Sequence, residues 1–282
     1  WVWNIPGYFN IGVACTDTHL NTSRADTVAM IVEDDALGTS SITFAELAQR
    51  TDQFAQVLRN LGVKVGDRVA AHATRGAAWV DTSTVSLTAS ATAARICAGA
   101  GIEHVRTTVS GNNKMAEAAQ LTVLASGPRT AYDRVLPLLQ RWGPNQFYLG
   151  EAEQARLMKL VINLMIAQTS AMLAEGLTLG QKGGLVWEDM WAVLGASAVA
   201  SPILKAKAVQ LSQRDFSPTF TVTQMNKDLD LILAEAAACE APVPQTAATR
   251  QLMASAQAQG DGELDYAAII RVLQRASGLN AD

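Results

Sequence analysis

The hydrophobic pattern divides the chain into a half that mixes strand and helix signals and a second half that reads as helix throughout. Near the start, residues 28–32 form a short apolar run of strand type. Residues 43–46 follow as a capping-box signature for the start of a helix. One face of that helix, with spacings of three and four, comprises Phe44, Leu47, Thr51, Phe54, Leu58 and Leu61.

From residue 79 to residue 150 the signals alternate between strand and helix. The predicted strands lie at residues 79–84, 102–109, 121–124 and 146–150, and the predicted helices lie at 88–100 and from Pro128 onward. After residue 151 helical patterns continue, with breaks predicted at residues 183–184, 201–202, 217–218 and 242–244. The sequence therefore predicts an α/β N-terminal half followed by an all-α helical C-terminal domain, with parts at 1–74, 75–150 and 151–282.

Composition and charge exclude several classes of function. The chain has 282 residues, 49% of them hydrophobic, 17% charged, and a net charge of −4, so no basic face is expected and no nucleic acid is predicted as a partner. Its three cysteines, far apart in sequence, predict neither a disulfide framework nor a zinc site, which favours a cytoplasmic protein.

No membrane association is predicted either. The first residues lack the basic and apolar regions of a signal peptide. The most apolar stretch, residues 157–179, is interpreted as a buried helix rather than a membrane span. It is interrupted by Lys159, Asn163, Gln168 and Glu175.

Three separated motifs carry candidate chemistry, and each also has an ordinary structural explanation. Residues 109–112 place a Ser-Gly pair directly after a strand, which suits a small carboxylate but is also common in turns. Lys159 and Asn163, four residues apart, share one helix face among apolar neighbours, where a lysine of lowered pKa could exchange a proton with an alcohol. The alternative is a lysine whose head reaches solvent at a helix end. The third motif, Lys227-Asp228, is by itself typical of a solvated surface pair.

Taken together, these motifs resemble the β-hydroxyacid dehydrogenase family, which includes 3-hydroxyisobutyrate, tartronate semialdehyde and 6-phosphogluconate dehydrogenases. The resemblance runs from about Arg75 to Gly278. Its ordered landmarks are residues 81–84, 109–111, 121–123, Gly150, Lys159 with Asn163, and 227–229. Residues 107–108 depart from the family, which usually has an acidic residue and Ala-Pro before the valine.

The resemblance implies a role for each motif. Lys159 would be the general acid/base, Asn163 would position the substrate, and Ser110, Gly111 and Asn112 would bind its carboxylate. On the cofactor side, Lys227 with Asp228 would close over NAD or NADP, and Ser83 and Thr84 would lie near the nicotinamide. The lysine at position 159 favours oxidation of a small 3-hydroxy acid over imine reduction. The family's helical halves form dimer contacts, which predicts a homodimer.

The glycine-rich phosphate loop of such enzymes, G-x-G-x-x-G, is missing from the sequence. Residues 99–101 follow a helix and residues 180–184 lie between helices, so neither fits the strand-to-helix position that the loop requires. The domain at 75–150 is therefore predicted to be an incomplete Rossmann-like domain, with cofactor binding that is weak or absent.

Residues 1–70 instead resemble the N-terminus of acyl-CoA synthetases, through residues 8–10, 14–17, 42–47 and 61–69. This resemblance implies a fusion with a junction near residues 70–75. No adenylation loop follows. Two alternatives to the dehydrogenase thus remain at this stage: a non-catalytic helical dimerisation or scaffold module, and an acyl-CoA synthetase fragment.

Overall fold

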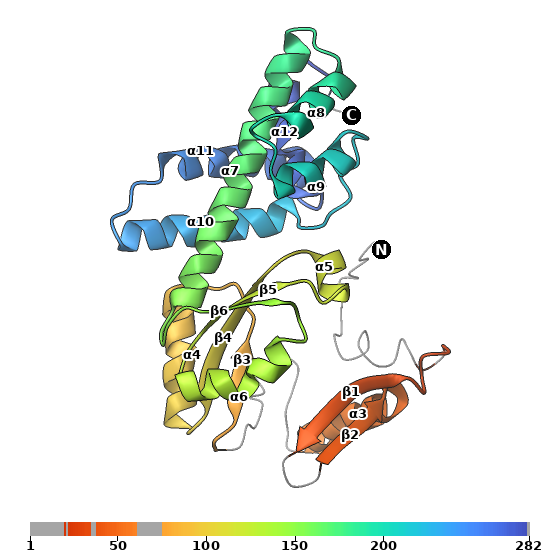
Figure 1. Ribbon diagram of the computed structural model, residues 1–282, viewed down its shortest axis with the longest axis vertical. Coiled ribbons are helices and arrows are strands. Elements are labelled where there is room, and N and C mark those ends of the chain that lie inside the picture. Colours follow the sequence, from red (N-terminus) through yellow and green to blue (C-terminus); the bar gives the residue numbers. More distant parts are fainter. Residues whose placement is uncertain (1–19, 21, 35–37, 61–74, 281–282) are drawn as a thin grey trace. The chain divides into compact units, whose positions relative to one another are not determined.

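A computed structural model describes residues 20, 22–34, 38–60 and 75–280 of the chain (Figure 1). The chain divides into two compact units, Trp1–His72 and Ala73–Asp282, and each is described separately.

In the first unit, an antiparallel hairpin precedes a helix. Strand β1 (Val28–Asp34) pairs with β2 (Gly38–Thr43), and α3 (Phe44–Asn60) follows at once. The predicted capping box is present: Thr43 Oγ1 accepts from the Glu46 backbone N–H at 3.2 Å, and Glu46 Oε2 accepts from the Thr43 N–H at 2.8 Å. Strand β2 was not predicted, because its sequence GTSSIT is polar and short. Leu61, the last position of the predicted helix face, lies outside the described residues.

The second unit begins with a four-stranded sheet in the order β3-β4-β5-β6. The outer pairs are parallel and the central pair, β4 with β5, is antiparallel. The strands are β3 (Ala78–Asp81), β4 (Glu103–Ser110), β5 (Thr122–Ser126) and β6 (Asn145–Tyr148). The helices between them are α4 (Leu87–Gly99), α5 (Asn113–Glu117) and α6 (Arg129–Leu139). All four predicted strands are present, as are both predicted helices, and within residues 75–150 α5 is the one element that the pattern missed.

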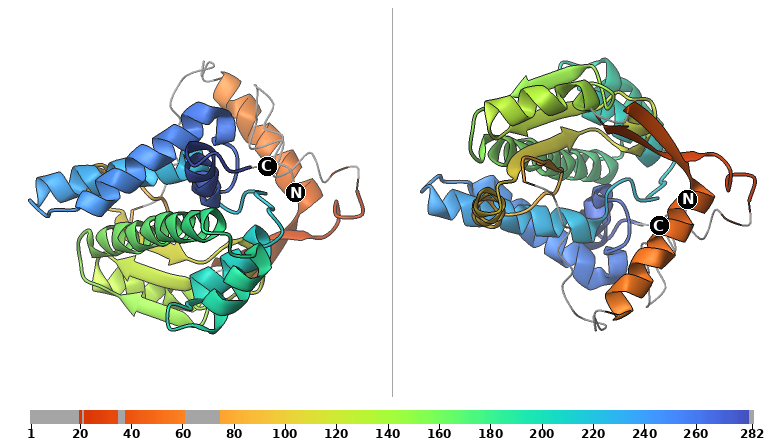
Figure 2. Two further views of the ribbon diagram at one scale, coloured as in Figure 1. Left: turned by 90° about the horizontal axis from the view of Figure 1, so that it is seen from above. Right: turned by 90° about the horizontal axis from the view of Figure 1, so that it is seen from below.

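Helix α7 (Gln154–Lys182) connects the sheet to the helical part of this unit. Figure 2 shows the sheet between α6 on one face and α7 on the other. The remaining helices are α8 (Trp187–Ala196), α9 (Pro202–Leu211), α10 (Val222–Ala238), α11 (Pro244–Ala256) and α12 (Ile269–Ala276). The α/β half followed by an all-α half is therefore confirmed.

One break in the helical half was not predicted. Between α11 and α12 the chain passes through a π turn, Gln257–Asp261, and a 3-10 turn, Tyr266–Ala268. Gly260 adopts a φ of +92°, in the left-handed region that favours glycine, and this conformation interrupts the helix.

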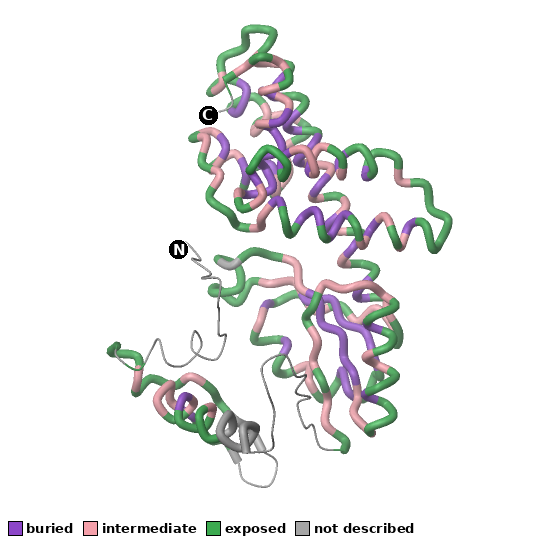
Figure 3. The backbone as a smooth tube through the Cα atoms, turned by 180° about the vertical axis from the view of Figure 1, so that it is seen from behind, coloured by how far each residue is buried: buried purple, intermediate pink, exposed green. Residues whose placement is uncertain are grey.

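Two hydrophobic cores support these parts, and the buried positions concentrate on the central strands and the inward faces of the helices (Figure 3). The core beneath the sheet contains Val105, Val123, Ala125, Ala131, Tyr132 and Leu139. The larger core joins α7 to α9, α10, α11 and α12 through residues such as Leu177, Leu204, Met225, Leu229, Met253 and Ile269.

Helix α7 is long and apolar enough to cross a membrane by length and composition alone. In the described structure it instead packs against β4, β5, α10, α11 and α12. Its buried polar side chains, Arg156, Asn163 and Ser170, face protein rather than lipid. These contacts favour the predicted buried helix.

Candidate functional site

Lys159 lies near the start of α7 and contacts the end of strand β4. Its Nζ atom donates a hydrogen bond of 2.8 Å to the carbonyl oxygen of Val109. Burial lowers the pKa of Lys159, the negative charge of Asp228 raises it and the positive charge of Lys227 lowers it, with a net decrease. The alternative is a lysine whose head reaches solvent at a helix end, and the partly buried position and the contact with a backbone carbonyl favour it less.

The third motif reaches the same place from α10. Asn163 Nδ2 donates to Asp228 Oδ2 at 2.5 Å, and Asp228 Oδ1 is paired with Lys227 Nζ at 2.7 Å. Lys227 also donates to the carbonyl oxygen of Thr84 at 2.9 Å. The loop after β3, helix α7 and helix α10 are thus joined by one chain of polar contacts.

The burial of Asp228 does not fit the solvated surface pair that the Lys227-Asp228 motif alone predicts. The Lys227 side chain is 52% exposed, as a surface lysine would be, but that of Asp228 is only 1% exposed. The sequence held a signal for this burial. Asp228 lies on the same helical face as Met225, Leu229 and Ile232, which are all buried.

The predicted substrate loop follows β4 directly. Ser110 is the last residue of the strand and pairs with Thr122. Gly111 has a φ of +141°, in the region that favours glycine, so the backbone at this turn requires glycine. Asn112 has a structural function, because its Oδ1 accepts from the Met115 N–H at 3.0 Å and caps α5.

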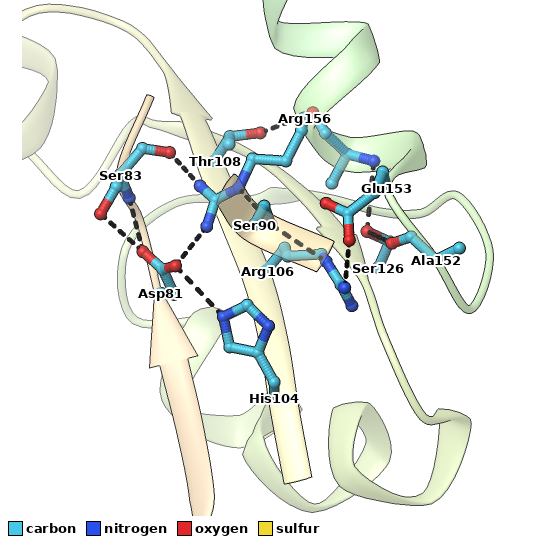
Figure 4. A network of polar contacts seen from close by, with 11 residues as sticks. Asp81, Ser83, Ser90, His104, Arg106, Thr108, Ser126, Ala152, Glu153 and Arg156 are labelled. Carbon is cyan, nitrogen blue, oxygen red and sulfur yellow. Dashed lines mark hydrogen bonds and ion pairs between the residues drawn. The ribbon is translucent and has the colours of Figure 1, made fainter. Parts of the chain in front are cut away.

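A buried polar network fixes the first turn of α7 against the sheet (Figure 4). Arg156, 1% exposed, forms an ion pair with Asp81 and donates to the carbonyl oxygen of Ser83. Asp81 Oδ1 also accepts from the Ser83 hydroxyl at 2.7 Å, and its Oδ2 lies 3.1 Å from His104 Nε2. Ser83 therefore contributes its carbonyl to the scaffold, and its predicted role near the nicotinamide stays a prediction.

These contacts shift the pKa values of the network. Burial opposes ionisation of Asp81, but hydrogen bonds from Ser83 and His104 and the charge of Arg156 outweigh it, so its pKa is lowered. Burial lowers the pKa of His104 despite the neighbouring Asp81 carboxylate. His104 is accordingly neutral at pH 7.

The second half of the network involves Arg106. This side chain forms an ion pair with Glu153, and its Nε donates to Ser90 Oγ at 3.3 Å. Arg156 Nε donates to the same hydroxyl at 3.2 Å, which a serine oxygen with two lone pairs can accept. Further bonds to the start of α7 run from Thr108 Oγ1 to the Ala155 carbonyl at 3.0 Å and from the Ala155 N–H to Ser126 Oγ at 3.2 Å.

Sequence reasoning did not identify this network. Its signals were the charged residues inside apolar patterns: Arg106 in the middle of a strand, and Arg156 three residues before Lys159 on one helix face. The network positions Lys159, because it fixes the turn of α7 from which that side chain extends.

Among the described residues, two features bear on cofactor binding: the contacts of Lys227 and the geometry of the glycine clusters. Thr84 and Lys227 bring a loop and an exposed ammonium beside Lys159. In the cluster at residues 99–101, Gly101 follows α4 and lies against Arg75. In the cluster at residues 180–184, Gly180 belongs to α7 and packs against Met190 of α8. Neither forms a strand-to-helix turn with open backbone N–H groups. No group of three metal-ligating side chains converges within the part of the chain that the structure describes.

Comparisons with known proteins agree with this geometry. Residues 154–273 match the family model described as NAD-binding of NADP-dependent 3-hydroxyisobutyrate dehydrogenase. Residues 18–150 match the model described as the NAD binding domain of 6-phosphogluconate dehydrogenase. The second match begins well before residue 75, and the comparisons do not support the predicted fusion with an acyl-CoA synthetase segment.

Individual relatives extend the likeness. The chain is 32% identical to 2-(hydroxymethyl)glutarate dehydrogenase of Eubacterium barkeri over 73% of its own length and 68% of the relative's. It is 30% identical to glyoxylate/succinic semialdehyde reductase 1 of Arabidopsis thaliana, over 71% and 69%. The Mycobacterium tuberculosis 3-hydroxyisobutyrate dehydrogenase structure matches with a TM-score of 0.66 at 25% identity, covering 72% of each chain.

Proposed function

We propose that this chain, which belongs to the NAD(P)-dependent β-hydroxyacid dehydrogenase family, interconverts a small 3-hydroxy acid and its oxo form with Lys159 as the general acid/base. One observation supports this assignment above the others. The Lys159 ammonium is partly buried, has a lowered pKa, and is held 2.8 Å from the Val109 carbonyl, directly beside the Ser110–Gly111 turn. A proton-transfer group and a candidate carboxylate-binding turn are therefore adjacent.

Each of the candidate residues is given one role in the proposed reaction, either proton transfer or binding. NAD or NADP, when bound, would accept the hydride that leaves the carbinol carbon of the substrate. Lys159 in its neutral form takes the hydroxyl proton during oxidation and returns it during reduction. Ser110, Gly111 and Asn112 bind the substrate carboxylate through hydroxyl and amide donors, and Asn163 positions the hydroxyl. Lys227, exposed beside Thr84, closes over the cofactor.

The alternatives have less support. The comparisons do not favour a non-catalytic scaffold or a ligase fragment, because the family models and the two relatives described above are of dehydrogenases and reductases. A cytoplasmic location remains our proposal, and it is consistent with the free thiols of Cys97 and Cys239. We likewise propose the division into parts at 1–74, 75–150 and 151–282.

A homodimer is part of the proposal. An apolar groove of about 430 Å³ lies between α7 and α8, and among its lining residues only Asp189 carries a charge. Several of its apolar side chains are more than half exposed: Met172, Leu185, Val186, Val193 and Val199. Apolar surface of this kind is typical of an interface, and a second copy would bury the same face on both subunits.

The test of the proposed function is turnover of defined compounds. Purified protein is mixed with NADPH or NADH and either 2-methyl-3-oxopropanoate, the oxo form of 3-hydroxyisobutyrate, or glyoxylate or succinic semialdehyde, and absorbance at the reduced-nicotinamide band is followed. The proposal expects consumption of reduced cofactor with the 3-oxo acid. Turnover of glyoxylate or succinic semialdehyde alone would support a dehydrogenase but replace the 3-hydroxy acid by a 2- or 4-hydroxy acid. Failure of every pair at millimolar cofactor, together with no detectable oxidation of the corresponding hydroxy acids, would contradict it.

A further inference from the structure

Asp228 lies between two groups of the site and contacts both of them. Its Oδ2 accepts from Asn163 Nδ2 at 2.5 Å, and its Oδ1 is 2.7 Å from Lys227 Nζ. Its neighbours on the same helical face, Met225 and Leu229, are buried in the core. The carboxylate is thus fixed by the packing of its helix, by a hydrogen bond from Asn163 and by an ion pair with Lys227.

We infer that Asp228 is a positioning residue of the reaction, acting through Asn163 and Lys227 rather than on the cofactor itself; this inference rests on the proposed function. An ionised carboxylate only accepts hydrogen bonds, so the Asn163 amide must turn its NH₂ group toward it. The amide oxygen of Asn163 is then the atom left for a substrate hydroxyl. Asn163 therefore presents an acceptor, in an orientation that Asp228 sets.

Asp228 is buried and Lys227 is exposed, so the two residues have different roles. With 1% exposure, Asp228 has almost no surface to offer a cofactor, and a carboxylate beside dinucleotide phosphates would repel them. Lys227 is half exposed, and its Nζ is held between Asp228 and the Thr84 carbonyl. Asp228 thus holds the cofactor-side lysine and the substrate-side amide in one arrangement.

The same geometry predicts that substitutions of Asp228 and of Lys227 shift the pKa of Lys159 in opposite directions. Two charged groups, both on α10, act on Lys159: Asp228 raises its pKa and Lys227 lowers it, in addition to the decrease caused by burial. Replacement of Asp228 by a neutral residue should lower the Lys159 pKa further. Replacement of Lys227 should raise it. The opposite signs test whether both charges lie close enough to act on Lys159, and the positioning role of Asp228 is tested by the kinetics.

The experiment follows the Lys159 side chain directly. The full chain is labelled with [¹³C]lysine, the Lys159 Cε signal is assigned with Lys159→Arg, and its titration is recorded in the wild type, Asp228→Asn and Lys227→Gln. We expect the Lys159 midpoint to move to lower pH in Asp228→Asn and to higher pH in Lys227→Gln. Asp230→Asn is the matched control, since Asp230 lies on the same helix but is exposed and pairs with Arg250. It should leave the Lys159 midpoint unchanged.

The second part of the experiment measures steady-state kinetics of the same variants. Asp228→Asn should lower kcat by about tenfold or more, because loss of correct placement by a small distance has effects of this order. The KM for the oxo substrate should change less than kcat. Asp230→Asn should match the wild type in both.

The outcomes separate this inference from the proposed function. Unchanged Lys159 midpoints in both Asp228→Asn and Lys227→Gln would overturn the inference, and so would an unchanged kcat in Asp228→Asn of an active protein. No turnover by the wild type would contradict the proposed function, while the NMR shifts would still be readable. If Asp228→Asn does not fold, Lys227→Gln, at an exposed position, decides by the sign of its shift.

Discussion

Arg156 and Lys159 extend from the same face of α7, one to the Ser83 carbonyl and Asp81 beside β3, the other to the Val109 carbonyl at the end of β4. The spacing of three residues places them on adjacent turns of one surface. The arginine is structural and the lysine is the proposed proton carrier. The position of the lysine depends on the arginine, because both fix the same turn of helix against the sheet.

That dependence predicts the cost of removing Arg156. In Arg156→Met, Asp81 keeps a mostly buried charge without its cation, and loss of one partner of a buried pair costs about 3–5 kcal/mol of unfolding free energy. Urea denaturation measures the difference. The control is Arg129→Met, whose pair with Asp133 is exposed, and the expected cost there is about 0–1 kcal/mol. Equal costs for the two variants would contradict the assigned role.

A second prediction concerns cofactor affinity. The sequence has no G-x-G-x-x-G, and the described glycine clusters do not form a phosphate cradle. We expect NADPH to bind at least roughly a hundredfold more weakly than to a relative with the intact loop, since loss of several charged hydrogen bonds at about 1.5 kcal/mol each exceeds about 2.7 kcal/mol. Calorimetric titration measures this directly. Micromolar binding would show that another part of the chain supplies the phosphate site.

Self-association follows from the apolar groove between α7 and α8. We expect a dimer without cofactor, detected by light scattering at tens of micromolar protein. Val193→Glu places a charge on an exposed lining residue of the groove and should give monomers. Val209→Glu, equally exposed but outside the groove lining, is the control and should remain dimeric. A monomeric wild type would contradict the proposed interface.

How far the sequence predicted these features depends on the kind of signal. Periodicity predicted the strands and helices of residues 78–276 well, because core-facing residues recur at fixed spacing. It missed strand β2, which is polar, and the turns after α11, where Gly260 adopts a positive φ. Neither feature leaves a hydrophobic period.

The site was predictable in part for a related reason. Motif order linked Ser110, Lys159 and Lys227, and the structure brings all three regions together. The contacts of Asp81 with His104 and Arg156 were not predictable. They join residues 23 and 75 positions apart, a pairing set by strand order and by the path of α7 rather than by local pattern.

The pH dependence of the free energy of unfolding should show the contribution of His104. Burial depresses its pKa in the folded state, so folding is favoured fully above the ordinary histidine value of 6.5 and loses stability as pH falls below it. His104→Asn should flatten the loss between about pH 6.5 and pH 5. The depressed pKa of Asp81 acts at lower pH, below its ordinary value of 3.8, so the two effects separate. Urea midpoints across this range give the measurement, and an unchanged slope in His104→Asn would refute the prediction.

The last prediction is the role of Lys159 itself. Its lowered pKa places the change between ammonium and amine below the ordinary lysine value of 10.5. Oxidation of a hydroxy acid needs the neutral amine, so its rate should rise with pH through that lowered pKa, whereas reduction needs the ammonium and should fall over the same range. Lys159→Ala should abolish turnover, and Lys159→Arg should fail nearly as badly, because a guanidinium does not release its proton. Asn163→Ala should lower turnover less, since positioning is easier to replace than proton transfer.

The decisive comparison is Lys159→Met, in which thermal midpoint and turnover are measured on the same protein. Methionine keeps the apolar stem but loses the hydrogen bond to the Val109 carbonyl and the attraction between the ammonium and Asp228, so stability should fall by about 1–3 kcal/mol. Turnover should vanish in both directions. If Lys159→Met retained turnover with a normal pH profile, the lysine would be removed from the mechanism, and its contact with Val109 would be a structural link between α7 and β4.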